Sequence, residues 1–338
     1  MKPLKYLFIS SMLFVATSCG NSWLDLEPST SVDTETSIKI LSDVEFTLNG
    51  IYSTMQSSDA YSGRLVYYGD VTGDDMQAVS STKRVANYYR FNFTKDDNPS
   101  SHWSYLYSII QNCNLILMNI DKLAIDEEDK AYRDDLKGEA LAIRGLALFD
   151  LTRIFGYPYL KDNGASLGVP IIEGLSTIDS KPTRNTVAQC YTKIIDDLTQ
   201  SISLLGEKFN KGKINKWGAM VLLSRVYLYK GENANALKMA GDAITGAEKN
   251  KYALWTNEDY PTAWGEDASA SKPGEVLFEI VNLTTDSPGK ESMGYLNSYD
   301  GYDDMCITCS FYQFLKEDPK DIRCLLYTSD AADDLIGV

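Results

Sequence analysis

The sequence predicts a mainly α-helical protein in which successive helices pack in pairs, with long irregular loops and few short strands. Apolar residues recur every three to four positions in six separate segments, and glycine, proline or capping residues bound most of these segments. Only one segment carries a strand-like pattern. A chain of 338 residues with 44% hydrophobic and 23% charged residues is long enough, and ordinary enough in composition, to bury a sizeable globular core.

Four long amphipathic segments come first along the chain. Each repeats apolar residues along one helical face: 37–56, 102–121, 129–155 and 186–205. Gly156 and Pro158 end the third segment, because proline removes a backbone donor and glycine adopts non-helical angles freely. Thr186 and Gln189 stand in capping-box spacing at the start of the fourth, where each side chain can satisfy a free backbone N–H group.

Two further helices and one strand complete the prediction. Asn215 can cap a helix over 216–230, and Gly231 separates it from a helix over 233–247. The best strand signal is 275–281, which alternates imperfectly. The remaining chain is expected to form long irregular loops over 57–101, 156–185 and 250–310.

The last helix pair has the spacing of a tetratricopeptide repeat. Tyr227 is followed after nine residues by Ala236, and after seven more by Ala243. Small alanines are needed where two helices cross closely, because larger side chains would separate them. This pattern favours a right-handed, tetratricopeptide-like helical solenoid but identifies no partner.

The charge balance excludes one broad class of partner. The chain carries 32 Lys and Arg against 47 Asp and Glu, a net charge of −15, so no nucleic acid partner is expected. It has a single histidine, and we find no phosphate-binding loop, nucleophile elbow or zinc-protease motif. Tyrosine outnumbers phenylalanine 22 to 11, which suits wet, planar recognition surfaces.

The first residues are typical of an exported lipoprotein. Residues 1–18 combine a lysine-containing start with an apolar stretch too short to span a membrane as a helix. Small residues directly before Cys19 resemble a bacterial lipobox, in which the cysteine thiol is acylated and the signal peptide is cleaved. Residues 19–35 would then be the lipidated cysteine and a polar tether, anchoring the protein to a membrane surface. The alternative is a plain signal peptide with an incidental cysteine.

The last fifteen residues, 324–338, resemble the in-frame translation of a sequencing adapter. On this interpretation the natural sequence visible in the chain ends at Arg323 and the protein is truncated at its C-terminus. The alternative is an ordinary acidic tail.

Eight segments between these ends carry a family resemblance: 23–28, 139–158, 181–184, 191–198, 212–215, 225–229, 275–280 and 318–323. Together they resemble SusD/RagB nutrient-binding outer-membrane lipoproteins, in which the matching segments follow one another in the same order. The resemblance implies an N-terminal helical region over 36–250, with tetratricopeptide-like pairs, and the start of a C-terminal region over 251–323.

The same resemblance implies a function without covalent chemistry. Such proteins face the cell exterior on the outer membrane, bind oligosaccharides or polysaccharides, and deliver them to a SusC-like TonB-dependent transporter. Two alternatives remain open from the sequence. One is a helical scaffold that binds a peptide or protein, and the other is a surface glycoside hydrolase, which needs a pair of suitably spaced carboxylates.

Two loops rich in tyrosine and charged residues, and one isolated tryptophan, supply the candidate ligand contacts. Aromatic faces can cover the C–H face of a sugar ring, while carboxylates and guanidinium groups bind its hydroxyls. The candidates are Tyr299, Tyr302, Trp264, Tyr295, Tyr89, Tyr68, Asp74 and Arg90. For each aromatic side chain the alternative is a structural role over the core, which we expect for Trp103 and Trp217.

Several charged residues are expected to be structural. Arg144 with Glu139, and Arg153 with Asp150, suit buried or half-buried ion pairs and caps. His102 precedes Trp103 at a helix start and is expected to be a surface or capping residue. Cys113 and Cys190 lie on apolar helix faces and are expected to be buried thiols.

No cofactor is expected from the sequence. Cys306 and Cys309 have zinc-like spacing but lack two further ligands. Two aspartate groups could bind Ca²⁺ through carboxylate oxygens, although neither has EF-hand spacing. These groups are Asp70, Asp74 and Asp75, and Asp300, Asp303 and Asp304.

Overall fold

The computed structural model describes residues 37–94, 99–177, 179–208, 210, 212–260, 274–283 and 285–321. Its helices and strands all belong to the unit that begins at Ile40. The expected signal peptide 1–18, Cys19, Trp264 and the tail 324–338 lie outside the described residues.

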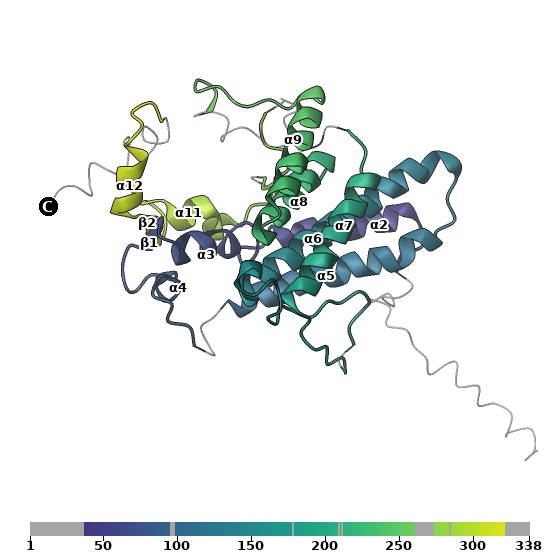
Figure 1. The fold of residues 1–338 in the computed structure, drawn as a ribbon, viewed down its shortest axis with the longest axis horizontal. Helices are drawn as coiled ribbons and strands as arrows, with labels where there is room; N and C mark the ends of the chain where they lie inside the picture. Colours follow the sequence, from purple (N-terminus) through teal and green to yellow (C-terminus); the bar gives the residue numbers. More distant parts are fainter. Residues whose placement is uncertain are drawn as a thin grey trace, which may run out of the picture. The chain divides into compact units, whose positions relative to one another are not determined.

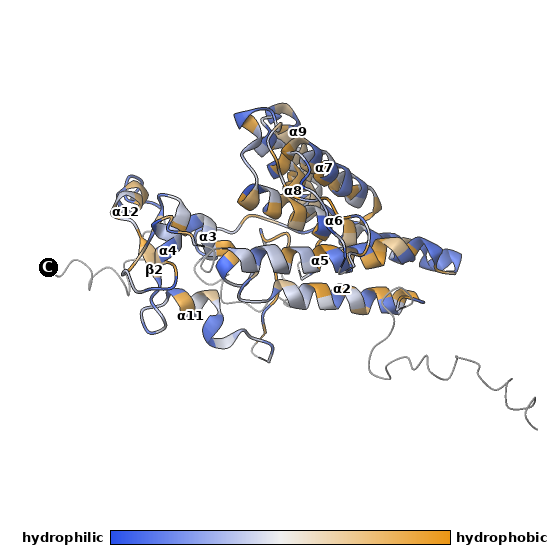
Figure 2. Cartoon of the chain, turned by 90° about the horizontal axis from the view of Figure 1, so that it is seen from below, coloured by the Kyte–Doolittle hydropathy of each residue, from blue (hydrophilic) through white to orange (hydrophobic). Residues whose placement is uncertain are grey.

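Six long helices, which we call the helical scaffold, confirm the predicted mainly α-helical class (Figure 1). Their bounds are α2 Leu41–Met55, α5 Ser100–Asn119, α6 Lys130–Phe155, α7 Val187–Leu204, α8 Lys216–Lys230 and α9 Asn233–Lys249. Consecutive helices from α5 to α9 pack against one another, and α2 packs against α5 and α6. Figure 2 shows hydrophobic and hydrophilic residues alternating along α2 and α5, as expected for helices with one buried face.

The predicted caps form where the sequence places them. The Thr186 hydroxyl accepts a hydrogen bond from the Gln189 N–H at 3.2 Å, which satisfies a free donor at the start of α7. Asn215 Oδ1 accepts from the N–H groups of Trp217 and Gly218 at the start of α8. Gly231 ends α8 at φ +84°, a left-handed conformation that glycine adopts without steric cost.

The α8–α9 pair has the close packing predicted from its alanines. Ala236 and Ala243 are buried, and Ala243 is fully inaccessible between the two helices. Trp217 packs beside Gly246, where a Cβ atom would lie only 2.0 Å from the indole ring. The pair therefore depends on small residues at its crossing, as tetratricopeptide-like helices do.

Helix α6 lies between α5 and α7 and carries the buried ion pair of the scaffold. Arg144 donates to both carboxylate oxygens of Asp197, at 2.8 and 2.6 Å, and to Asn114 Oδ1 at 2.9 Å. The expected pairing of Arg144 with Glu139 is therefore wrong, since Glu139 instead accepts a hydrogen bond from the Tyr52 hydroxyl at 2.9 Å. Residues 139 and 144 are five apart, and five positions do not face each other on a helix.

The remaining predictions for single side chains have mixed outcomes. The Arg153–Asp150 ion pair is confirmed, and Cys113 and Cys190 are buried free thiols. His102 is fully buried rather than at the surface, with Nδ1 3.1 Å from the Asp59 carbonyl oxygen. Trp217 is buried as expected, whereas Trp103 is only half-buried.

A second region, which we call the β1–β2 module, is built from two chain segments far apart in the sequence (Figure 1). The first contributes α3 Arg64–Thr72, β1 Met76–Ala78 and α4 Ala86–Tyr89. The second contributes the 3-10 turn η6 Gly289–Glu291, α11 Met293–Asn297, β2 Met305–Ile307 and α12 Cys309–Leu315. Strands β1 and β2 pair antiparallel with Met76 opposite Ile307. The expectation that 57–101 and 250–310 are wholly irregular is therefore wrong.

The predicted strand over 275–281 does not form within the described structure. This segment pairs with no strand and is irregular, with bends at Glu275 and Leu277. Short 3-10 turns complete the described elements: η3 Ile120–Lys122, η4 Glu127–Asp129 and η5 Tyr159–Lys161. No helix within the described ranges is both long and apolar enough to cross a membrane.

Candidate functional site

The β1–β2 module brings together the two loops that contain most of the candidate ligand residues. Besides the strand pairing, the Thr308 hydroxyl donates to the Asp74 carbonyl oxygen at 2.8 Å. The Thr308 N–H group donates to the Asp75 carbonyl oxygen at 2.9 Å. The same two loops also share a buried apolar cluster, which consists of Tyr67, Val71, Val85, Tyr88, Leu296 and Met305. The candidate loops are thus joined by backbone pairing and by a shared core.

Arg84 is the polar centre of this junction. Its guanidinium donates through Nη1 to Glu291 at 3.0 Å and through Nε to Asp304 Oδ2 at 3.0 Å. It also lies 4.0 Å from the centre of the Tyr302 ring, a cation–π geometry. The Tyr302 ring in turn meets Tyr295 edge-on, with centroids 5.1 Å apart and planes at 83°. We call these five residues the Arg84 cluster.

Lys83, the residue before Arg84, adds two further contacts to this junction. Its Nζ donates to the Tyr302 carbonyl oxygen at 2.6 Å and lies 3.8 Å from Asp303 Oδ2. Because Asp303 faces Lys83 and the buried Asp304 faces Arg84, these carboxylates do not form a common oxygen cluster with Asp300. Across the described ranges, no group of three or more His, Cys, Asp or Glu side chains is arranged to hold a metal ion.

Aromatic side chains are exposed around this junction. A chain of ring contacts runs from Phe91 to Phe93, from Phe93 to the mostly buried Tyr88, and from Tyr88 to Tyr68. The aromatic residues of the module that remain exposed to solvent are Tyr89, Phe91, Phe93, Tyr299, Tyr302 and Phe314. Large aromatic faces open to solvent, on a base of paired strands, are typical of a recognition surface rather than of a core.

The predicted ligand residues divide into three groups. Tyr295 and Tyr302 are in contact and are fixed by the Arg84 cluster. Tyr299, Tyr89, Asp74 and Arg90 are exposed, and Tyr299 is the most accessible of the described tyrosines at 76%. Tyr68 is half-buried against Tyr88 and His102, so its position is largely structural.

Several residues of the site were not predicted from the sequence. Arg84, Lys83 and Glu291 hold the junction, and Phe91 and Phe93 add exposed aromatic area. One signal was available, because Lys83-Arg84 is a pair of adjacent cations in a strongly acidic chain. Its partners lie more than 200 positions away, so no local spacing rule connects them.

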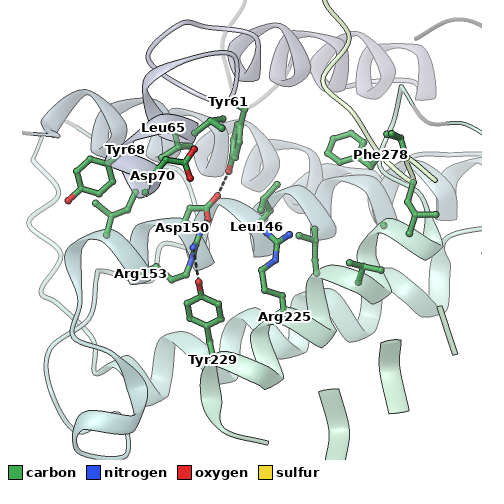
Figure 3. A pocket seen from close by; sticks show the side chains of 18 of the residues that line it. Tyr61, Leu65, Tyr68, Asp70, Leu146, Asp150, Arg153, Arg225, Tyr229 and Phe278 are labelled. Carbon is green, nitrogen blue, oxygen red and sulfur yellow. Dashed lines mark hydrogen bonds and ion pairs between the residues drawn. The ribbon is translucent and has the colours of Figure 1, made fainter. Parts of the chain in front are cut away.

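A separate cavity of about 950 Å³ lies between α3, α6, α8 and residues 275–278 (Figure 3). The Tyr61 hydroxyl donates to Asp150 Oδ2 at 2.7 Å, and Arg153 bridges Asp150 and the Tyr229 hydroxyl. Burial, followed by the charge of Asp150, raises the pKa of Tyr61 well above its usual value, so this hydroxyl remains a donor. Asp150 is thereby engaged by two partners, Tyr61 and Arg153.

Comparison with known proteins gives consistent matches. A SusD-like family model matches residues 22–228. Its description is "Starch-binding associating with outer membrane". SusD-like protein P2 of Formosa agariphila is 28% identical over 89% of this chain and 57% of its own length. A SusD-like protein of Bacteroides ovatus is 25% identical over 70% of this chain and 42% of its own length. The chain spans about half the length of these curated relatives.

Solved structures show the same fold. A protein of Bacteroides vulgatus ATCC 8482 that has been provisionally assigned to sugar binding is 82% identical, with a TM-score of 0.83. The match covers 85% of this chain and 64% of that one. A SusD superfamily protein of the same organism is 37% identical with a TM-score of 0.80, covering 86% of this chain and 65% of the other.

Proposed function

The chain belongs to the SusD-like family, and on that premise we propose that it binds oligosaccharides or polysaccharides without cleaving them, through the β1–β2 module. We propose further that the whole protein is lipid-anchored at Cys19, faces the cell exterior from the outer membrane, and passes its glycan to a SusC-like TonB-dependent transporter. The proposal agrees with the provisional sugar-binding assignment of the 82% identical relative.

One observation carries the glycan-binding proposal. Arg84 lies against the Tyr302 ring, which in turn meets Tyr295 at 83°, and Tyr302 remains 38% exposed. A ring whose orientation is already fixed loses little conformational entropy on binding, so more of its contact energy contributes to affinity. An aromatic face of this kind covers the apolar face of a pyranose, and the neighbouring carboxylates and guanidinium groups can bind its hydroxyls.

The arrangement of charges favours binding over catalysis. Three carboxylates of the module, Glu291, Asp303 and Asp304, are each engaged by an arginine or lysine. A retaining or inverting hydrolase needs two carboxyl groups that face the scissile bond. These three carboxylates instead face an arginine or a lysine.

Calorimetric titration with a panel of soluble glycans tests the proposal. The panel includes maltoheptaose, soluble starch, a β-1,3-glucan and a mannan, and each sample is assayed for new reducing ends afterwards. We expect saturable binding of at least one glycan with no release of reducing ends. Turnover, or binding of peptides with no glycan bound, would refute the proposal in favour of a hydrolase or of a peptide-binding scaffold.

A matched pair of aromatic variants assigns the binding to the module. Tyr302→Ala is expected to weaken glycan binding by tenfold or more, because it removes the fixed ring. Tyr157→Ala removes a tyrosine that is 57% exposed but lies outside the module, and it should leave binding unchanged. Equal effects of the two variants would place the glycan elsewhere.

Anchoring and transport need separate experiments in a Bacteroidetes host. Cys19→Ala in the full-length protein is expected to release the protein from the membrane fraction, and an unchanged fraction would contradict the lipid anchor. Co-purification with an epitope-tagged SusC-like transporter encoded beside the gene, together with loss of growth on the bound glycan after deletion, tests delivery.

A further inference from the structure

A second pocket, which we call the Arg184 pocket, lies outside the β1–β2 module, where the end of α6 meets the loop over 156–186. Its volume is about 480 Å³, within the range of roughly 300–1,000 Å³ that is typical of small-molecule sites. Apolar and aromatic side chains line it together with one serine and one cation, and no described carboxylate does. These lining residues are Ile154, Phe155, Tyr157, Ser166, Leu167 and Arg184.

Arg184 is exposed to solvent in this pocket, yet it is held by two contacts. Its Nη1 donates to the Phe155 carbonyl oxygen at 3.2 Å, and its guanidinium lies 5.9 Å from the centre of the Trp103 ring. Trp103 in turn meets the Phe155 ring edge-on, with centroids 5.0 Å apart. Since one bond to a carbonyl leaves most of its N–H donors unused, the guanidinium is oriented for bidentate binding of a planar carboxylate.

The lack of a carboxylate partner sets Arg184 apart from most arginines of this acidic chain. No ion pair joins Arg184 to an acid among the described residues, although the net charge is −15. Most of the described arginines are paired with an aspartate or glutamate: Arg64, Arg84, Arg133, Arg144 and Arg153. A cation that is held in a pocket without a counter-charge is suited to an anionic ligand.

The charges beside the pocket also favour an anion. Lys161 lies with its Nζ 3.1 Å from the centre of the Tyr157 ring, and it has no ion-pair partner among the described residues. The next residue, Asp162, accepts a hydrogen bond from the Ser166 hydroxyl and is thereby held within its own turn. The Ser166 oxygen can still accept a hydrogen bond from a ligand hydroxyl.

We infer that the Arg184 pocket binds an acidic sugar, with the carboxylate of a hexuronate on the Arg184 guanidinium. The pyranose ring contacts the apolar walls at Ile154 and Leu167, and a ring hydroxyl donates to Ser166. Neutral glycans, which we propose for the β1–β2 module, offer Arg184 no carboxylate. The two sites therefore take different sugars, and this inference does not rest on glycan binding by the module.

A peptide fits the Arg184 pocket less well than an acidic sugar does. The C-terminal carboxylate of a peptide could also pair with Arg184, but the amide N–H groups that precede it need acceptors. The backbone carbonyl oxygens of Phe155 and Ser166 are already engaged, by Arg184 and by the Val187 N–H group. Sugar hydroxyls both donate and accept, so they can use the Ser166 hydroxyl and the remaining donors of Arg184.

Titration of the present chain with trigalacturonate and with its methyl ester tests the inference. The two ligands share their rings and hydroxyls and differ in the charge of the carboxyl groups. We expect trigalacturonate to bind at least about tenfold more tightly than the ester, and its affinity to fall as the salt concentration rises. Equal affinities, or no binding of trigalacturonate, would overturn the inference.

Matched arginine variants assign this binding to the pocket. Arg184→Gln should lower the affinity for trigalacturonate by about tenfold, whereas Arg184→Lys should lose only part of it, because it keeps the charge without the planar fork. Arg133→Gln is the control, since it removes the same charge near the other end of α6, where Arg133 contacts Asp134. Thermal unfolding verifies that each variant is folded. An equal loss of affinity in Arg184→Gln and Arg133→Gln would overturn the inference.

Two further titrations separate this pocket from other sites. Arg184→Gln should bind neutral glycans as the native protein does, and Arg84→Met should bind trigalacturonate as the native protein does. Loss of trigalacturonate binding in Arg84→Met alone would place the acidic sugar in the module and overturn the inference. Arg184-dependent binding of the dipeptide acetyl-alanyl-leucine, with no binding of trigalacturonate, would assign the pocket to a peptide carboxylate instead.

Discussion

The helical scaffold and the β1–β2 module are held together by different kinds of contact. In the scaffold, each helix from α5 to α9 packs against the next helix along the chain. In the module, the contacts that join its two segments link residues more than 200 positions apart, such as Arg84 with Glu291 and Met76 with Ile307. The scaffold can therefore assemble from local contacts, whereas the module forms only after a long stretch of chain has been ordered.

This difference assigns different roles to the two regions. The scaffold buries its charged groups in complete networks, as with Arg144, Asp197 and Asn114. The module leaves large aromatic rings exposed and uses ion pairs at its surface to orient them. We therefore expect substitutions in the scaffold to change stability, and substitutions in the module to change ligand binding first.

The largest loss of stability is expected from Arg144→Met. It leaves the fully buried Asp197 with only Lys193 as an ionic partner, which should lower the free energy of unfolding by about 3 kcal/mol. Denaturant titration measures this loss, and the double variant Arg144→Met/Asp197→Leu should recover much of it. The control Lys238→Met removes an exposed pair with Asp242 and should cost little. Equal losses of stability in Arg144→Met and Lys238→Met would mean that the buried network contributes no more to stability than the exposed pair does.

Glu139 makes the stability of the scaffold depend on pH. Burial raises the pKa of this carboxyl group to about 7 against the opposing effects of Lys213 and the Tyr52 hydroxyl, while its ordinary value is 4.5. Between these values the native state holds a proton that the unfolded chain has released, so the contribution of Glu139 to stability falls as pH rises. Glu139→Gln should remove this dependence and be more stable than the native protein at pH 8 by about 2–3 kcal/mol.

The comparison of unfolding midpoints at pH 5 and pH 8 measures the effect of Glu139→Gln. His102 contributes with the opposite sign, since burial lowers its pKa and stability is lost as pH falls below about 6.5. Only the difference between variant and native protein therefore isolates Glu139. Glu127→Gln, at an exposed side chain, should show no such difference. If the stability difference between Glu139→Gln and the native protein is also the same at pH 5 and pH 8, the raised pKa of Glu139 is contradicted.

A smaller effect on stability is expected from Arg84→Met in the module. The variant removes the ionic partner of the buried Asp304, so local opening of the module should become easier by about 1–2 kcal/mol. Hydrogen exchange in peptides covering 289–307 measures this opening, and glycan binding should weaken at the same time. Arg90→Met is the matched control for hydrogen exchange alone, because the exposed Arg90 side chain makes no hydrogen bond or ion pair among the described residues. Unchanged exchange in Arg84→Met would show that the strand pairing alone holds the module.

The smallest change in stability is expected from Tyr299→Ala. The ring is 76% exposed and packs against no other described ring, so the free energy of unfolding should change by less than about 0.5 kcal/mol. The affinity of the Tyr299→Ala variant for glycan should nevertheless fall by about tenfold, because an aromatic stacking surface is lost. A large loss of stability with unchanged affinity would assign this ring to the fold instead of the binding surface.

Some failures of sequence-based prediction have physical explanations. His102 was expected to be a surface or capping residue because it begins a helix, but it contacts the Asp59 carbonyl oxygen and the Tyr68 ring and is fully buried. Residues 275–281 have a strand-like sequence, yet a strand needs a hydrogen-bonded neighbour, and none is present in the described structure. Arg144 could be predicted to be structural, but its partner on another helix could not be identified from spacing along one helix.

The sequence by itself determined the helical scaffold, its caps at Thr186 and Asn215, and the kinds of residue available for binding. These features depend on periodicity and on interactions within a few positions, which are fully specified by neighbouring residues. Only the tertiary structure decided which tyrosines are exposed and that Arg84 orients Tyr302. Those contacts join segments more than 200 residues apart, and their geometry is set by how the whole chain packs.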